Sequence, residues 1–173
     1  MTKAVELRRH TDNDGDVLTP DGVRAALEIG ARLHGGYEVL VSSGMQRATQ
    51  TLACLLAGLG EQVSRGAIVE SGLRTETERR WREIYAQTGK PDLESFRAAD
   101  PTFVDAEAER LGAALLRIFA TLSEDGRALA VGHSPTNEAA VFALTGEVVA
   151  PLAKGAGTLV VAAGSKYRVE PLD

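Results

Sequence analysis

The sequence holds a single cysteine, Cys54, in 173 residues, so the chain cannot form a disulfide within itself. Chains without disulfides are typical of reducing compartments, and we therefore expect a cytoplasmic protein. Cys54 falls inside an apolar helical pattern, which favours a packing role over a reactive thiol. The three histidines are scattered without metal-ligand spacing, so we expect no metal site.

Aromatic residues and long apolar runs are also scarce. Aromatics make up 5% of the chain, with one tryptophan, which leaves little for stacking on single-stranded nucleic acid. The formal net charge of -5 argues against a general nucleic-acid binder. No apolar run approaches the ~20 residues that span a membrane, and the first residues lead into a strand pattern without a secretory segment. We expect neither nucleic acid nor a membrane as a partner.

The composition is otherwise that of an ordinary globular protein, with 44% hydrophobic and 25% charged residues. At this length we expect one domain spanning residues 1–173. Strand patterns alternate with amphipathic helical patterns, which predicts an α/β fold in layers with a mostly parallel sheet. Two strand patterns at residues 158–162 and 166–169, joined at Gly164-Ser165, predict a hairpin and hence an antiparallel edge.

Two of the predicted strands end on a histidine. Val5-Glu6-Leu7-Arg8-Arg9 alternates apolar and polar residues and leads to His10. The apolar run at residues 128–131 leads through a glycine to His133. Ligands of α/β proteins bind outside the carboxyl ends of parallel strands, so both histidines are placed for chemistry. Arg8 alternates with Arg9 and should point to the opposite face, in a structural or surface role.

Several helices have recognisable starts. Thr19-Pro20 reads as an N-cap followed by the first helical position. Another helix follows Ser42-Ser43-Gly44 and has Arg47 in its first turn, where free backbone N–H groups favour anions. We expect a third helix over residues 111–122, and a fourth with Ser134 as its N-cap. The charged residues 70–81 read as a solvated helix, and residues 91–102 as a loop or a short, lid-like insertion.

If the strands are neighbours, Arg9, His10, Arg47 and His133 converge on one spot. Guanidinium groups, imidazoles and helix N-termini together suit a phosphate-like dianion. A histidine can also attack phosphorus covalently, provided that its ring is neutral, and neighbouring arginines disfavour the protonated ring. The residues alone supply no obvious proton donor for the leaving group.

Four segments in order resemble the histidine phosphatase superfamily, the phosphoglycerate mutase-like fold. Arg9-His10 matches the family's strand-end pair, and Leu18-Thr19-Pro20-Asp21-Gly22 matches its Leu-Thr-x-x-Gly segment. Ser42-Ser43-Gly44-Met45-Gln46-Arg47-Ala48, with Thr51 behind, matches Ser-Ser-x-x-x-Arg-Ala, and Val131-Gly132-His133 matches the second histidine. The resemblance implies a single α/β/α sandwich in which residues of about 70–105 form a substrate-side insertion.

The resemblance also implies a metal-independent phosphatase without a cofactor. It implies that His10 becomes phosphorylated, while Arg9, Arg47 and His133 hold the phosphoryl oxygens. Aligning on Leu73 and Trp81 puts Thr75 where the family has its catalytic glutamate, with Glu76 displaced by one residue. Glu76 is therefore the first candidate for the catalytic acid and Glu78 the second, although an ion-pair role suits Glu76 equally well. Some members of the family manage without this acid.

Two departures from the family pattern concern the loop after the nucleophile. Thr11 replaces the family's glycine and could crowd the phosphate. The loop is also short, and Asn13 is its one candidate phosphate ligand.

Two other functions stay open at this point. A phosphoglycerate-mutase-type phosphotransferase would use the same pocket, although short insertions speak against the extended pocket that it needs. A catalytically weak phospho-ligand-binding module would explain Thr11 and the displaced glutamate. The sequence does not name the substrate: sugar phosphates, nucleotides and phosphohistidine proteins all fit, and nothing sets the oligomeric state.

Overall fold

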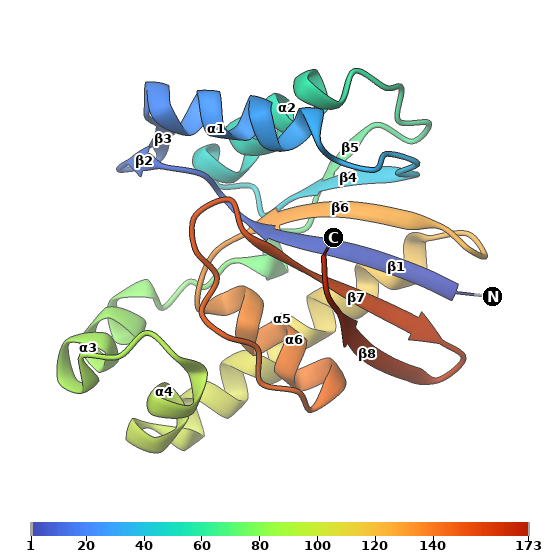
Figure 1. The fold of residues 1–173 in the computed structure, drawn as a ribbon. Helices are drawn as coiled ribbons and strands as arrows, with labels where there is room; N and C mark the ends of the chain where they lie inside the picture. Colours follow the sequence, from blue (N-terminus) through green and yellow to red (C-terminus); the bar gives the residue numbers. More distant parts are fainter. Residues whose placement is uncertain (1, 173) are drawn as a thin grey trace.

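The computed structural model describes residues 2–172 as one central sheet between layers of helices (Figure 1). The strands are β1 (Thr2–Arg9), β2 (Asn13–Asp14), β3 (Val17–Leu18), β4 (Val39–Ser42), β5 (Ala67–Val69), β6 (Arg127–Gly132), β7 (Gly157–Ala163) and β8 (Lys166–Glu170). The helices are α1 (Pro20–Ala31), α2 (Gln46–Leu59), α3 (Glu78–Thr88), α4 (Leu93–Ala99), α5 (Pro101–Thr121) and α6 (Thr136–Thr145), with a 3₁₀ turn, η1 (Ser71–Leu73).

The main sheet has six strands in the order β5-β4-β6-β1-β7-β8, and β2 pairs with β3 in a separate small sheet. Strand β6 pairs in parallel with both β1 and β4, and β4 pairs in parallel with β5. Strands β7 and β8 run antiparallel and form the predicted hairpin edge. The predicted mostly parallel α/β fold with an antiparallel edge is confirmed.

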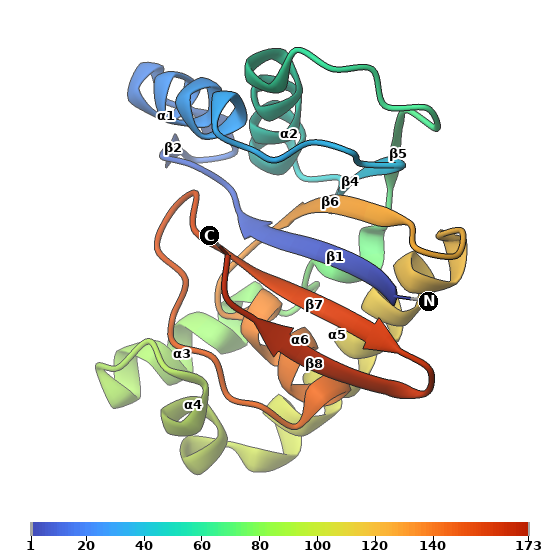
Figure 2. The ribbon, with the colours of Figure 1, turned by 45° about the vertical axis from the view of Figure 1, so that its right-hand side comes forward.

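Helices α1 and α2 cover one face of the sheet, and α5 and α6 cover the other (Figures 1 and 2). Val5 and Leu7 of β1 are fully buried in the larger core, which α5 and α6 share. Leu129 and Val131 of β6 pack on the opposite side with residues of α2. Over residues 2–172, the helices are too short or too polar for any of them to cross a membrane.

Glu6 is a buried carboxylate in the middle of β1, with 2% of its surface exposed. It accepts hydrogen bonds from the Nε of Arg8 at 2.7 Å, the guanidinium of Arg127 at 2.8 Å and the hydroxyl of Tyr37 at 2.6 Å. A buried charge is tolerated when it is paired and hydrogen-bonded in this way. Arg8 therefore has the structural role that strand alternation predicted, on the opposite face from Arg9.

The start of α1 follows the predicted capping chemistry. Thr19 is the N-cap, its hydroxyl accepts from the N–H of Gly22 at 3.0 Å, and Pro20 occupies the first helical position. Gly22 packs directly on the loop after β1, because a Cβ built there would lie 2.0 Å from the carbonyl oxygen of Asp12. The Leu-Thr-x-x-Gly segment thus combines a helix cap with a close backbone contact.

Three local predictions were wrong. Residues 70–77 are a 3₁₀ turn and an irregular segment instead of a helix, and α3 begins only at Glu78. Residues 91–102, predicted as a loop or a short, lid-like insertion, contain α4, so the loop is wrong; the N-cap Asp92 accepts from the N–H of Ser95 at 2.8 Å. Ser134 is not the N-cap of α6, because its hydroxyl donates to the carboxylate of Glu138 and the helix begins at Thr136.

We predict that Gly22→Ala lowers the free energy of unfolding by about 1–3 kcal/mol, the usual cost of overpacking. The new methyl group meets backbone oxygen, which cannot rotate away. Urea unfolding followed by circular dichroism measures the change. Glu28→Ala, at an exposed position of the same helix, is the control and should stay within about 0.5 kcal/mol of the wild type. An equally stable Gly22→Ala variant would contradict the contact.

Candidate active site

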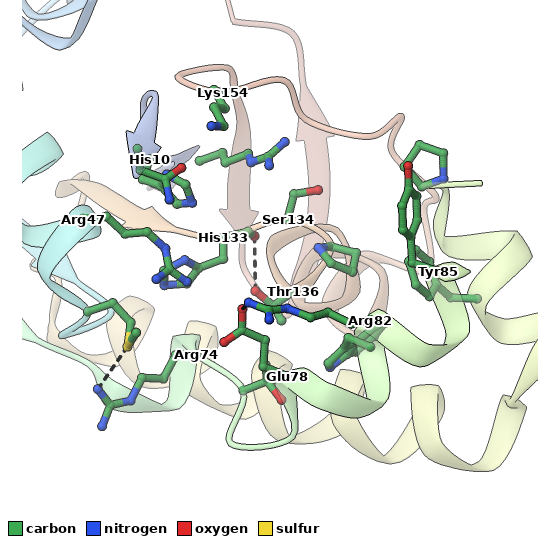
Figure 3. Close-up of a pocket in the computed structure, with 18 of the residues that line it drawn as sticks. His10, Arg47, Arg74, Glu78, Arg82, Tyr85, His133, Ser134, Thr136 and Lys154 are labelled. Carbon is green, nitrogen blue, oxygen red and sulfur yellow. Dashed lines mark hydrogen bonds and ion pairs between the residues drawn. The ribbon is translucent and has the colours of Figure 1, made fainter. Parts of the chain in front are cut away.

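The carboxyl ends of three adjacent strands, β4, β6 and β1, meet at one edge of the sheet. Arg9 ends β1 and His10 follows it, His133 follows β6, and Arg47 lies in the first turn of α2, just after β4. All four side chains line one pocket, and Figure 3 shows the imidazoles and the Arg47 guanidinium facing one another. The predicted convergence of these residues is confirmed.

His10 is 5% exposed, and its ring orientation is fixed by one hydrogen bond. Its Nδ1 lies 2.8 Å from the carbonyl oxygen of Thr11. A carbonyl can only accept, so Nδ1 carries the proton and Nε2 keeps its lone pair in the neutral ring. Burial lowers the pKa of His10 to about 4, and the nearby charges of Arg47, Arg9 and Lys154 act in the same direction. The ring is therefore neutral near pH 7.

His133 lies beside His10, with 5.3 Å between the ring centroids. Its Nε2 is 2.7 Å from the hydroxyl oxygen of Ser43, and its backbone N–H donates to the side-chain oxygen of Asn137 at 3.2 Å. Burial lowers the pKa of His133 to about 3, followed by the charge of Arg47. Within residues 2–172 its buried Nδ1 has no hydrogen-bond partner.

The two arginines of the pocket are anchored from different sides. Arg9 donates to the carbonyl oxygen of Leu152 at 2.9 Å, and within residues 2–172 its buried Nε has no partner. Arg47 donates to the carboxylate of Asp16 at 3.0 Å. Asp16 also accepts from the backbone N–H groups of Gln46 and Arg47. The N-terminus of α2, which was expected to face a ligand anion, thus already binds the carboxylate of Asp16.

The pocket has a volume of about 650 Å³. Its cationic lining residues are Arg9, Arg47, Arg74, Arg82 and Lys154, and the one acidic lining residue in the described part of the chain is Glu78. This excess of positive charge suits an anionic ligand. The wall away from the histidines comes from the irregular segment after η1 and from α3, and it includes Tyr85, which is 51% exposed (Figure 3).

The other sequence-predicted residues are placed as follows. Asn13 lines the pocket, but its amide donates to the carbonyl oxygen of Gly15 at 2.8 Å. Glu76 is exposed and is not among the lining residues, whereas Glu78 is. Thr11 is buried outside the pocket, and its hydroxyl donates to the carbonyl oxygen of Gly22 at 2.8 Å, so it does not crowd the ligand space.

Sequence reasoning missed several residues that shape the site. Ser43 was part of a recognised segment, yet its contact with His133 depends on strand order. Asp16, Arg82 and Lys154 gave no signal beyond their charge. Within residues 2–172, no group of three or more His, Cys, Asp or Glu side chains is placed to hold a metal ion. The prediction that the reaction needs no metal or cofactor stays a prediction.

Comparison with known protein families identifies one family that matches this chain. The model of the histidine phosphatase superfamily (branch 1) matches residues 2–155. A phosphoglycerate mutase from Bacillus anthracis shares the fold with a TM-score of 0.73, at 18% identity over 99% of this chain and 92% of that one. No curated protein matches the sequence.

Two solved phosphatases share the fold as well. A mycobacterial glucosyl-3-phosphoglycerate phosphatase aligns with a TM-score of 0.69 and 17% identity, over 98% of each chain. The protein histidine phosphatase SixA, solved with tungstate, aligns with a TM-score of 0.59 and 20% identity, over 96% of this chain and 94% of that one. At these identities the likeness concerns the fold alone. Because the family model covers most of its length, the chain belongs to the histidine phosphatase superfamily.

Proposed function

We propose that this protein hydrolyses a phosphomonoester or phosphoramidate through a phosphohistidine on His10. The observation that carries the proposal is the hydrogen bond from Nδ1 of His10 to the Thr11 carbonyl oxygen in a ring that burial keeps neutral. It leaves the Nε2 lone pair as a nucleophile in a pocket where the positive charges of Arg47, Arg9 and Lys154 act on the ring.

The reaction has two steps. Nε2 of His10 attacks phosphorus, the bond from phosphorus to the leaving oxygen or nitrogen breaks, and the leaving atom takes a proton from an acid. Water then attacks the phosphohistidine, the P–N bond breaks, and inorganic phosphate leaves a neutral His10. In both steps Arg9, Arg47 and His133 stabilise the charge on the equatorial oxygens.

Glu78 takes the role of the acid in this proposal. Among residues 2–172 it is the one acidic side chain that lines the pocket, and it pairs with Arg82 at 2.7 Å, one helical turn away on α3. Glu76, which the sequence favoured, precedes α3 in the irregular segment and does not line the pocket. Protonated Glu78 would give its proton to the leaving group and regain one from the attacking water.

The substrate in this proposal is a phosphorylated small molecule. A pocket of about 650 Å³ has room for a small leaving group beside the phosphoryl group. Besides Glu78, the exposed ring of Tyr85 and the guanidinium of Arg82 are side chains of α3 that would meet that leaving group. The mutase and the phospho-ligand-binding module are the rival functions to be separated by experiment.

The first test is hydrolysis of p-nitrophenyl phosphate with a chelator present. We predict that His10→Ala lowers turnover about 10³-fold or more, because the nucleophile is removed. His34→Ala is the matched control, since His34 is exposed and outside the pocket, and it should keep wild-type activity. Turnover that survives His10→Ala would rule out the phosphohistidine route. A wild type that binds vanadate but hydrolyses nothing would favour the binding module, and an isomerised product would favour the mutase.

The role of Glu78 is tested by comparing Glu78→Gln with Glu76→Gln. We predict that Glu78→Gln lowers kcat on an alkyl phosphate about 10²–10⁴-fold, and much less on p-nitrophenyl phosphate, whose leaving group needs no proton. Steady-state kinetics with both substrates measure the contrast. Glu76→Gln should leave both rates unchanged. The reverse order of the two variants would return the acid to Glu76.

The ionisation of the two pocket histidines gives a pH prediction. With folded pKa values of about 4 and 3 for His10 and His133, both rings should stay neutral as the pH falls from 8 to about 5 and protonate only below that. Ring ¹⁵N NMR, assigned with the alanine variants, reads this directly, whereas activity also reports the substrate phosphate, which titrates at about pH 6. A His10 that titrates between pH 6 and 7 would contradict the neutral, buried ring.

A further inference from the structure

Glu138 is a buried carboxylate directly behind the pocket, in the first turn of α6. It is 2% exposed and is not among the lining residues. One of its oxygens accepts from the hydroxyl of Ser134 at 2.5 Å and from the backbone N–H of Leu152 at 2.8 Å. Within residues 2–172, its other oxygen has no hydrogen-bond partner. A carboxylate this buried needs a compensating group nearby.

Arg9 is that compensating group, and the two residues are connected through Leu152. The backbone N–H of Leu152 donates to Glu138, and the carbonyl oxygen of Leu152 accepts from the guanidinium of Arg9 at 2.9 Å. The buried Nε of Arg9 and the second oxygen of Glu138 are both without partners among residues 2–172. Burial raises the pKa of Glu138, while the charge of Arg9 opposes this shift. The opposite charges of the two groups therefore attract each other.

Glu138 does not line the pocket, so it does not occupy the space of a ligand. Arg9 lines the pocket together with Arg47, whose positive charge repels it. The negative charge of Glu138 acts on Arg9 in the opposite sense to that of Arg47. Glu138 can therefore offset the repulsion between the two arginines without competing with phosphoryl oxygens.

We propose that Glu138 is the positioning residue for Arg9. Its carboxylate fixes the loop at Leu152, whose carbonyl holds Arg9, and its charge keeps the guanidinium directed at the phosphoryl group. This inference rests on the proposed function for its kinetic test. It goes beyond that function because Glu138 itself touches neither the substrate nor the reacting atoms.

A double-mutant cycle tests the proposal. We predict that Glu138→Ala lowers kcat/KM for p-nitrophenyl phosphate about 10²-fold in the wild-type background. In an Arg9→Ala background the same change should cost less than about 3-fold, because the group it positions is gone. Glu138→Gln, which keeps an acceptor oxygen for Ser134 and Leu152 but removes the charge, should cost about 10-fold. Equal losses in both backgrounds would overturn the proposal, since Glu138 would then act independently of Arg9.

Two controls separate positioning from a loss of folding. Leu115→Ala removes a fully buried core side chain of α5 that is not part of the pocket lining. It should lower the melting temperature by a similar amount in the wild-type and Arg9→Ala backgrounds. Its effect on kcat/KM should not become smaller in the Arg9→Ala background. If Glu138→Ala does not fold, Glu138→Gln alone completes the cycle, and a loss undiminished by Arg9→Ala contradicts the proposal.

A binding measurement keeps this test apart from the test of the proposed function. Vanadate affinity, measured by calorimetry through the same cycle, needs no turnover. If the wild type hydrolyses no phosphoester, the proposed function fails, yet coupled losses of vanadate affinity would still support the positioning role. If the wild type hydrolyses phosphoesters normally but Glu138→Ala lowers vanadate affinity equally in both backgrounds, the positioning role is refuted and the proposed function is not.

Discussion

The parallel pairing of β6 with both β1 and β4 is the constraint on which the site depends. Each of these strands ends at the same edge of the sheet, so residues that are far apart in the sequence are brought together there. The ring centroids of His10 and His133 lie 5.3 Å apart although 123 positions separate the residues in the chain. A one-residue slip of β6 against β1 would break the alignment of Arg9 with Gly132, which precedes His133.

The same burial that completes the fold sets the chemistry of the histidines. A ring surrounded by protein and cations is neutral at a pH where a free histidine begins to protonate. The cost is a cluster of positive groups with little solvent to screen them. Asp16 partly neutralises Arg47, and Asp12 pairs with Lys154 at 2.7 Å. Carboxylates close to the cationic pocket thus balance part of its positive charge.

Much of this arrangement could be predicted because it depends on local patterns. Alternation in β1, the Thr19-Pro20 cap and the two strand ends that precede a histidine are signals carried by neighbouring residues, and each predicts the element that the structure contains. The segment after residue 70 was misread because its charges suit a helix, while Glu70 caps a 3₁₀ turn and pairs with Arg117 on α5. Ser134 was misread because its hydroxyl donates to Glu138, four residues further along, instead of capping the helix. A tertiary contact decided the first case and a local side-chain contact the second.

The hydrogen bond from Arg9 to the main-chain carbonyl of Leu152 has a consequence for how sites of this kind change during evolution. Every amino acid offers the same carbonyl oxygen, so the side chain at this position is free to drift as long as it fits the buried space and the loop keeps its course. An essential part of an anion site can therefore be inherited as a path of the backbone rather than as a residue type. A comparison of amino-acid sequences alone does not detect such a backbone contact. A change in the course of the loop between α6 and β7 could therefore alter ligand binding while the sequence motifs stay the same.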